Sequence, residues 1–261
     1  MIYFCIPAYN EEATVGLLLW KIRRVLEASS REYLLLVGDD ASTDSTQEVL
    51  EPYQKALPLV VLRSPSHQGY AATVEGLLKE ALTRSDRHKR DIAVVMPADF
   101  AVDPDALPEF LKHIDSGADL VVGEATLTGD VGKWDRRVRE WAPRILGRHA
   151  RIPGVRDVVS GFAAFRLVSL RNAFRDCEGR WLTTQDWAAN AQLLGWAAAG
   201  SRRVEVVPVT ERLDRHTRAH RHAPWARARA LWAARSLLPA PPAGQKAERG
   251  QQATPRGQEA A

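Results

Sequence analysis

The sequence predicts an α/β fold in which a single, mainly parallel sheet is flanked by helices. Short apolar runs rich in branched residues alternate with longer stretches whose apolar residues recur at helical spacing. Strands covered by helices on both faces have this continuous apolar character, and the alternation is typical of βαβ units. The apolar runs lie at 2–6, 34–37, 59–62, 92–96, 120–122 and 204–209.

The length and composition predict one large domain followed by a tail. At 261 residues, nearly half of them hydrophobic, the chain is long enough to bury a large core. The regular alternation covers about residues 1–125, and a second half at about 126–238 carries a stretch containing Trp and Arg, a helical run and another strand. From 239 to 261 Pro, Gly, Gln and Ala replace apolar periodicity, which predicts a disordered tail.

Charge and cysteine content narrow the class of protein. Lys and Arg exceed Asp and Glu by four, and the excess lies between Arg202 and Arg235, which favours an anionic ligand over nucleic acid. Cys5 and Cys177 are far apart in the sequence, which favours a reduced, cytoplasmic protein. We recognise no signal sequence and no apolar stretch long enough to cross a bilayer. We therefore expect a soluble protein, or one lying on the inner face of a membrane.

Two polar motifs follow the first two apolar runs. They read Pro-Ala-Tyr-Asn-Glu at 7–11 and Asp-Asp-Ala-Ser-Thr-Asp at 39–44. Because the carboxyl ends of parallel strands meet at one edge of a sheet, open α/β folds bind nucleotides at such strand-to-helix turns. The alternative is that Asp40, Ser42 and Asp44 only cap the next helix. At Asp40 and Ser42 the motif predicts a ligand contact and a helix cap equally.

Four residues of these motifs have side chains suited to a nucleotide. Pro7 and Tyr9 offer a rigid turn and an aromatic face to a base. Glu11 and Asp39 accept hydrogen bonds from base NH groups or ribose hydroxyls. The ordered pair of motifs resembles the nucleotide-binding half of the family 2 glycosyltransferases, which have the GT-A fold. The resemblance implies that these four residues bind a nucleotide sugar, and that 1–238 is a family 2 domain with a nucleotide-sugar half and an acceptor half.

A glycine and a carboxylate farther along the chain extend the resemblance. The segment 68–72 is similar to the family's Asn-x-Gly-x-x-x-Ala, in which a glycine, here Gly69, lets the backbone turn into a helix beside the nucleotide. The segment 94–100 occupies the place of the family's Asp-x-Asp, whose carboxylates hold Mg²⁺ or Mn²⁺ against the diphosphate. The resemblance implies that Ala98 and Asp99 contact the donor, and that Asp99 is a catalytic, metal-binding residue.

Three positions in this region depart from the family's pattern. Pro97 stands in place of the first Asp of Asp-x-Asp, so we expect a weaker metal site with one carboxylate, Asp99. Ala101 stands where the polyprenyl-phosphate branch often has Gln or His, and Ala125 stands where an arginine would be expected. These departures keep open the alternative of a nucleotide-sugar-binding protein with weakened or lost catalysis.

The second half of the chain carries the residues expected on the acceptor side. Ser160 and Gly161 belong to a segment, 157–162, that resembles the family's Asp-x-x-Ser-Gly-Phe turn. Asp186 lies where an acidic pair opens a helix, which predicts either the general base for a hydroxyl acceptor or a carboxylate stabilised by the helix dipole. Arg137 lies where related enzymes have a phosphate-contacting arginine, and a solvated helix face is the alternative.

A basic segment follows the last predicted strand. Arg212, Thr217 and Arg218 match, residue by residue, the Arg, Ser and Lys of Arg-x-x-Gly-x-Ser-Lys in the dolichol-phosphate mannose synthase-like branch. Arg215 replaces the glycine. The resemblance implies that this loop folds over the diphosphate or over an acceptor phosphate, because guanidinium groups bind phosphate bidentately.

Together these motifs predict a glycosyltransferase that moves a hexose from a UDP- or GDP-sugar to an acceptor. The branch it resembles uses a polyprenyl phosphate, which is already anionic and needs no base. The basic segment around Trp225 and Trp232 predicts contact with a membrane surface. A soluble hydroxyl acceptor, with Asp186 as the base, is the alternative. A nucleotidyltransferase is a third hypothesis, although no Gly-rich phosphate loop opens the first strand.

Overall fold

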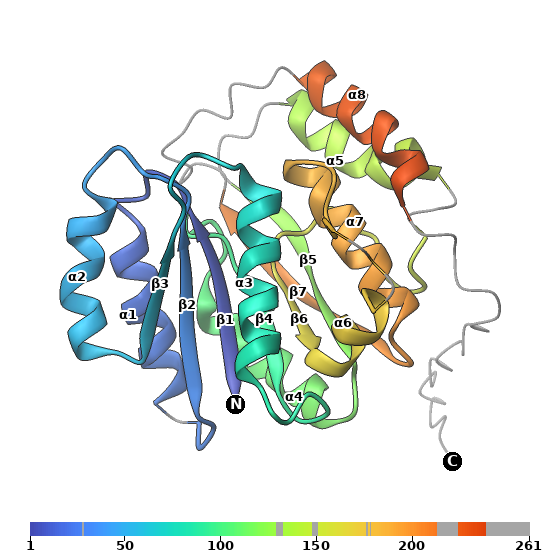
Figure 1. Cartoon of the computed structure of the whole chain (residues 1–261). Coiled ribbons are helices and arrows are strands. Elements are labelled where there is room, and N and C mark those ends of the chain that lie inside the picture. The colour runs from blue at the N-terminus through green and yellow to red at the C-terminus, as the bar shows by residue number, and fades with distance from the viewer. Residues whose placement is uncertain are drawn as a thin grey trace, which may run out of the picture.

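A single sheet of seven strands forms the centre of the described structure (Figure 1). The computed structural model describes residues 1–27, 29–128, 133–147, 151–175, 177, 179–212 and 224–238. The strand order is β3-β2-β1-β4-β6-β5-β7. The strands are β1 (Ile2–Ala8), β2 (Tyr33–Asp39), β3 (Leu59–Arg63), β4 (Ile92–Val95), β5 (Leu120–Thr128), β6 (Ala163–Arg166) and β7 (Val204–Arg212).

The pairing confirms the predicted sheet and adds one strand to it. β1 pairs in parallel with both β2 and β4, β2 with β3, and β5 with β7. β6 runs antiparallel between β4 and β5. The sequence analysis did not predict β6, because a run of four residues is too short to show a periodicity. Because β6 is antiparallel to its neighbours, the segment that precedes it lies at the edge where the parallel strands end.

Helices cover both faces of the sheet, as predicted. Helices α1, α2 and α4 pack on one face, and α3, α6 and α7 pack on the other. Helix α8 packs against α5 and α7 beyond them (Figure 1). The helices are α1 (Val15–Leu26), α2 (Thr46–Ala56), α3 (Tyr70–Arg84), α4 (Leu107–Asp115), α5 (Lys133–Leu146), α6 (Leu167–Ala173), α7 (Asp186–Ala199) and α8 (Pro224–Ala234), with 3₁₀ turns at Pro104–Ala106 and Arg235–Leu237.

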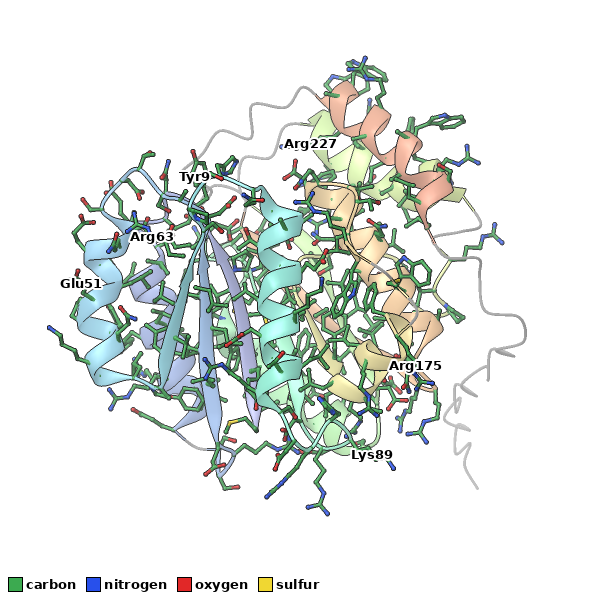
Figure 2. The ribbon with its side chains drawn as sticks, viewed as in Figure 1. Tyr9, Glu51, Arg63, Lys89, Arg175 and Arg227 are labelled. Atoms are coloured by element: carbon green, nitrogen blue, oxygen red, sulfur yellow. The ribbon has the colours of Figure 1, made fainter. Side chains whose placement is uncertain are left out.

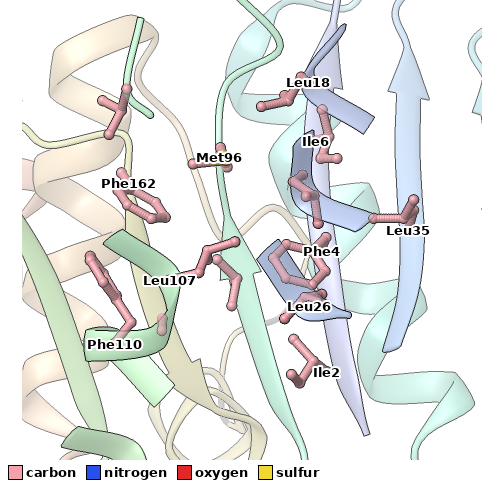
Figure 3. Packing of buried hydrophobic residues seen from close by; sticks show 14 of the residues in the cluster. Ile2, Phe4, Ile6, Leu18, Leu26, Leu35, Met96, Leu107, Phe110 and Phe162 are labelled. Carbon is pink, nitrogen blue, oxygen red and sulfur yellow. The ribbon is translucent and has the colours of Figure 1, made fainter. Parts of the chain in front are cut away.

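The first strand shows how the two cores are divided. Side chains alternate across a strand, so Ile2, Phe4 and Ile6 point to the face that α1 and α4 cover (Figure 3). Tyr3 and Cys5 point to the opposite face, against α3. Both sets are buried, which explains why β1 reads as a continuous apolar run.

The described helices and the C-terminal tail bear on the other predictions about the organisation of the chain. Within the described residues, no helix combines the length and the apolar character needed to span a bilayer. The tail predicted at 239–261 lies outside the described residues.

Candidate active site

The two polar motifs meet at the carboxyl edge of the parallel strands. The register pairs Ala8 with Asp39, and Asp39 with Arg63, so the ends of β1, β2 and β3 lie side by side. Tyr9 follows β1 directly and lies at this end of the molecule, whereas Lys89 lies at the opposite end (Figure 2). The structure therefore brings together residues that are distant in sequence, as expected of an open α/β fold.

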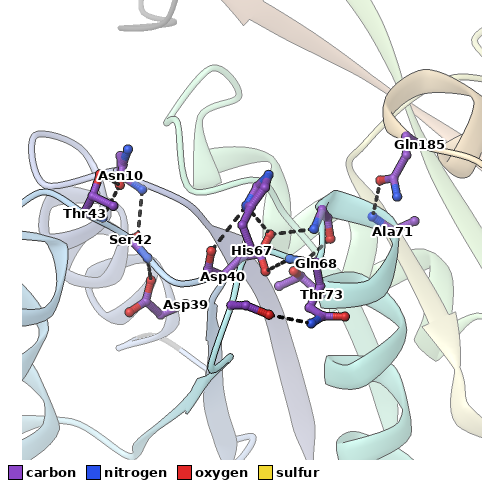
Figure 4. Close-up of polar contacts among 12 residues, drawn as sticks. Asn10, Asp39, Asp40, Ser42, Thr43, His67, Gln68, Ala71, Thr73 and Gln185 are labelled. Carbon is purple, nitrogen blue, oxygen red and sulfur yellow. Dashed lines mark hydrogen bonds and ion pairs between the residues drawn. The ribbon is translucent and has the colours of Figure 1, made fainter.

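Asp39 carries a buried carboxylate that is only half satisfied. Its side chain is 1% exposed, and Oδ1 accepts a hydrogen bond from the N–H of Ser42 at 3.0 Å (Figure 4). Oδ2 lies 3.6 Å from Nε of Arg63 and has no hydrogen-bond partner among the described residues. Such an oxygen is costly unless something pairs with it, and a ligand NH or hydroxyl is a suitable donor.

Asp40 and Ser42 do not cap the helix that follows β2, so the capping alternative is wrong for both. The two oxygens of Asp40 accept hydrogen bonds from the N–H groups of Gln68 and Gly69, at 2.7 and 2.8 Å (Figure 4). Oγ of Ser42 accepts the N–H of Asn10 at 2.8 Å. The N-cap of α2 has no side-chain hydrogen bond. Both side chains instead fix the loops that surround Asp39.

An aromatic pair stands at the rim of this edge. The rings of Tyr9 and His67 have centroids 4.2 Å apart and are tilted by 33° to each other. Nδ1 of His67 lies 2.8 Å from Oδ2 of Asp40, which orients the imidazole. His67 belongs to no recognisable motif, so the sequence alone did not indicate it. The pair offers a π-face on which a base can stack.

Glu11 anchors the turn after β1. Its N–H donates to Oγ1 of Thr46 at 2.7 Å, and its Oε2 accepts the hydroxyl of Thr14 at 2.9 Å. The carboxylate is thus held at the start of α1. Its predicted contact with a nucleotide stays a prediction.

Gly161 lies where the two halves of the chain touch. A Cβ at this position would lie 3.1 Å from Cγ of Pro97, 3.3 Å from Nδ2 of Asn190 and 3.6 Å from the hydroxyl of Tyr70. Such close approach leaves little room for a side chain, which explains the glycine. The Tyr70 hydroxyl donates to Oδ1 of Asn190 at 2.8 Å. Ser160, next to this glycine, is buried, and its Oγ accepts the N–H of Phe162 at 3.2 Å.

Tyr70 also connects the two predicted catalytic carboxylates. Burial raises the pKa of its phenol, and the nearby carboxylates of Asp99 and Asp186 raise that pKa further. The hydrogen bond to Asn190 lowers the pKa, but by less. The phenol therefore stays protonated and acts as a hydrogen-bond donor. Asp99 and Asp186, 87 positions apart in sequence, thus both raise the pKa of this one phenol.

Asp99 has the surroundings of a weak metal ligand. Its Oδ1 accepts the N–H of Ala101 at 3.0 Å, and Pro97 packs on Gly161 where a second carboxylate would stand. The N–H of buried Ala98 lies 3.3 Å from the carbonyl oxygen of Pro7. The part of the chain that the structure describes contains no group of three or more His, Cys, Asp or Glu side chains arranged around a metal position. One carboxylate fits a Mg²⁺ or Mn²⁺ ion only when diphosphate oxygens and waters complete the shell.

Asp186 opens α7 in an unusual backbone conformation. It is exposed, and its φ is +50°. Oε1 of the preceding residue, Gln185, accepts the N–H of Ala71 at 3.1 Å, and a Cβ on Gly69 would lie 3.0 Å from this amide (Figure 4). Gly69 itself has φ +91°, which favours glycine. This contact ties the start of α7 to the start of α3 and fixes Asp186 beside the nucleotide half.

Backbone strain is concentrated at this edge. Among the described residues, the non-glycine residues with positive φ are Asn10, Ala41, Phe100 and Asp186. Three of them follow β1, β2 and β4, and the fourth begins α7. Each such residue costs about 1 to 3 kcal/mol, and structures keep such strain mainly at functional sites. The strain therefore supports a functional site at the carboxyl edge of the sheet.

A buried arginine that the sequence analysis missed links three segments of the acceptor half. The guanidinium of Arg139, on α5, lies 2.7 Å from Oδ2 of Asp157 and 2.8 Å from Oε2 of Glu211, on β7. Burial alone lowers the pKa of Arg139, but the two carboxylates raise it above its ordinary value. The predicted Arg137 is exposed, and its guanidinium lies 5.1 Å from the centre of the Trp134 ring. Its predicted contact with a phosphate stays a prediction.

The end of β7 reaches the Asp99 loop. The N–H of Arg212 donates to the carbonyl oxygen of Ala101 at 2.8 Å, and Val102 bridges to Glu211. The predicted basic loop thus starts beside the carboxylate expected to face the diphosphate. Thr217 and Arg218 lie outside the described residues.

The chain belongs to glycosyl transferase family 2, whose family model matches residues 3–186. That range runs from β1 to the first residue of α7 and so contains both motifs, the Asp99 loop and Gly161. The matched range therefore covers the part of the chain that carries the candidate site.

Two curated relatives are similar to the chain over about the same length. The dolichol-phosphate mannosyltransferase of Pyrococcus furiosus is 31% identical over 167 residues, which are 62% of this chain and 45% of that protein. The polyprenol monophosphomannose synthase of Mycolicibacterium smegmatis is 28% identical over 166 residues, which are 62% of this chain and 60% of that protein. The chain thus matches about half the length of these relatives.

Solved structures share the fold over more of the chain. One is that of glucosyl-3-phosphoglycerate synthase from Mycobacterium tuberculosis in complex with Mn²⁺, uridine diphosphate and glucosyl-3-phosphoglycerate. It has a TM-score of 0.59 and 20% sequence identity, and the match covers 92% of this chain and 81% of that chain. At this identity the likeness shows the GT-A fold alone.

Proposed function

We propose that this protein transfers a hexose from a UDP- or GDP-sugar to a polyprenyl phosphate at the inner face of a membrane. The observation that carries the donor part is the buried Oδ2 of Asp39 at the carboxyl edge of the sheet, which has no hydrogen-bond partner among the described residues. The adjacent rings of Tyr9 and His67 stand at the rim of the same edge. A base on the rings and a ribose or base donor on Asp39 would satisfy both features.

Both curated relatives are named for polyprenyl-phosphate chemistry, and this supports the acceptor. A phosphate acceptor is already anionic. The site therefore needs positive charge to hold this acceptor, and it needs no base to activate it. Arg212, beside the Asp99 loop, and Arg218 after it would supply that charge. We propose that the sugar diphosphate lies between this basic loop and Asp99.

A divalent cation is proposed to enter with the donor. Asp99 would contribute one ligand, and the diphosphate and waters would contribute the others. The cation would offset the charge that builds up on the leaving nucleotide.

Asp186 favours a second candidate, a transferase with a soluble hydroxyl acceptor. Its carboxylate is exposed, its backbone has positive φ, and its charge, like that of Asp99, raises the pKa of the Tyr70 phenol. A hydroxyl acceptor needs a base at such a position. The departures at Pro97, Ala101 and Ala125 support a third candidate, a nucleotide-sugar-binding protein with weakened or lost catalysis.

We predict that a nucleoside diphosphate stabilises the fold. A ligand that binds only the native state at about 100 times its Kd adds about 2.7 kcal/mol, which raises Tm by about 5 to 10 °C in a protein of this size. Thermal shift with UDP and GDP at millimolar concentration measures this. The Asp39→Asn variant should lose most of the shift, and Asp115→Asn, at an exposed position on α4, should keep it. No shift with either nucleotide would reject the nucleotide site.

We predict that two substitutions separate the acceptor classes. With a lipid-phosphate acceptor, Asp186→Asn should keep most of the activity, because the nucleophile is already charged. Arg218→Ala should lose a charge-assisted phosphate contact, about 1.5 to 3 kcal/mol. A hydroxyl acceptor reverses the ranking, since losing a general base slows the step about 10² to 10⁴-fold. Steady-state rates of the two variants decide between the acceptors.

A further inference from the structure

Four tryptophans on two adjacent helices are exposed to solvent. Trp134 and Trp141 on α5 are 51% and 54% exposed, and Trp225 and Trp232 on α8 are 72% and 62% exposed. A folded domain rarely leaves its largest apolar side chains uncovered in one place. The opposite faces of both helices are buried in a separate hydrophobic cluster, so these tryptophans are not needed to hold the helices in place.

The four side chains form one surface. Each pair is separated by nearly two helical turns, so its members lie on the same side of their helix. The rings of Trp134 and Trp225 are 5.8 Å apart, near the start of both helices. Gly147, after the end of α5, lies beside the guanidinium of Arg235, after the end of α8. The two helices therefore run side by side in the same direction, and the two stripes of tryptophan adjoin.

Arginines accompany these tryptophans. The guanidinium of Arg137 lies over the ring of Trp134, and that of Arg235 lies over the ring of Trp232, at 5.1 and 4.3 Å from the ring centres. Arg144 on α5 and Arg229 on α8 are also exposed. Glu140 is an exposed acidic residue on α5, and its single negative charge is outweighed by these four arginines. We call the four tryptophans and these four arginines the tryptophan–arginine surface.

We propose that the tryptophan–arginine surface docks the enzyme on an anionic lipid membrane. Tryptophan prefers the boundary between headgroups and acyl chains, where its ring meets apolar chains and its N–H stays hydrated. Arginines beside it bind lipid phosphates and are drawn to the negative potential of an anionic leaflet. Both needs are met on the same side of α5 and α8.

The position of this surface suits an acceptor held in a bilayer. Arg227, on α8, and Tyr9, at the carboxyl edge of the sheet, lie toward the same end of the molecule (Figure 2). Helix α8 packs on α7, whose first residue is Asp186. The reason for membrane docking, access to a lipid acceptor, rests on the proposed function. The membrane binding is inferred from the tryptophan–arginine surface alone.

Co-sedimentation with vesicles tests the proposal. The full chain should bind vesicles that contain both phosphatidylglycerol and phosphatidylcholine more strongly than vesicles of phosphatidylcholine alone. Added salt should weaken its binding to the vesicles that contain phosphatidylglycerol. The double variant Trp225→Ala/Trp232→Ala should lower the partition coefficient about tenfold or more, because membrane binding scales with the apolar area inserted. Arg144→Gln/Arg229→Gln should reduce the preference for anionic vesicles.

Trp20 provides a matched control. It is 51% exposed on α1, with the guanidinium of Arg24 5.5 Å from its ring centre, so Trp20→Ala removes a similar pair elsewhere. Trp20→Ala should bind vesicles as the parent does. A Tm of Trp225→Ala/Trp232→Ala equal to that of the parent would show that the double variant is folded. The proposal is overturned if the double variant partitions like the parent, or if it only converts a dimer into a monomer in sedimentation velocity. Vesicle binding without hexose transfer to polyprenyl phosphate would keep the docking surface and reject the proposed function.

Discussion

Replacing Arg139 with methionine is expected to lower the free energy of unfolding by about 3 to 5 kcal/mol. Its side chain is buried between Asp157 and Glu211, and removing it leaves two carboxylates without their counterion. Asp157 is itself 8% exposed and also accepts the N–H of Ala125, so water does not readily replace the guanidinium. The loss should appear as a lower midpoint in urea denaturation with little change in slope.

Arg137 is the matched control for this substitution. It lies two positions away on the same helix, but it is exposed, so Arg137→Met should change the free energy of unfolding by less than about 0.5 kcal/mol. Replacing all three ionised residues with apolar side chains should recover most of the loss, because the buried carboxylates are then gone as well. A loss below about 1 kcal/mol for Arg139→Met would contradict the assigned role of the triad.

Replacing Asp99 with asparagine is expected to lower kcat/KM about 10² to 10³-fold, as the loss of one group that stabilises developing charge typically does. Asp99 is the carboxylate that remains at the place of the paired acidic motif, and its charge raises the pKa of Tyr70. It belongs to the loop whose Val102 bridges to Glu211 on β7. Steady-state kinetics of hexose transfer measures the effect. Asp105→Asn is the matched control, since Asp105 is 64% exposed and pairs with Lys21 at the surface.

The same position sets the strength of the metal site. Pro97→Asp restores the second carboxylate and should tighten Mn²⁺ about tenfold in the presence of nucleotide, because a charged ligand replaces a ring that carries no donor. Titration calorimetry at saturating UDP or GDP measures this. Tight Mn²⁺ binding by the unmodified protein that survives Asp99→Asn would show that the cation is held elsewhere.

Local patterns were enough to predict much of the fold and the meeting of the first two motifs at one edge of the sheet. The motifs follow directly on β1 and β2, and the parallel pairing of these strands brings Ala8 beside Asp39. β6 was missed because its four residues are too few for a period. The capping alternative for Asp40 was wrong because its partners, at 68 and 69, come from a later loop.

The residues that the sequence analysis missed are those whose partners are distant in the chain. Tyr70 and Asn190 are 120 positions apart, and Arg139 and Glu211 are 72 apart. Neither pair has a spacing that a periodicity or a short motif can reveal. A buried arginine and an exposed one, such as Arg139 and Arg137, look alike until the packing of α5 is known.

The central claim, hexose transfer to a lipid phosphate, is tested most directly by following labelled sugar from a set of UDP- and GDP-hexoses. The protein is incubated with each donor, with and without Mn²⁺, in the presence of polyprenyl phosphate in vesicles or of soluble hydroxyl acceptors. The account predicts that one donor gives a labelled product in the organic phase that depends on polyprenyl phosphate and persists in Asp186→Asn. Label found only on a soluble acceptor and lost in Asp186→Asn, or nucleotide binding without any transfer, would contradict it.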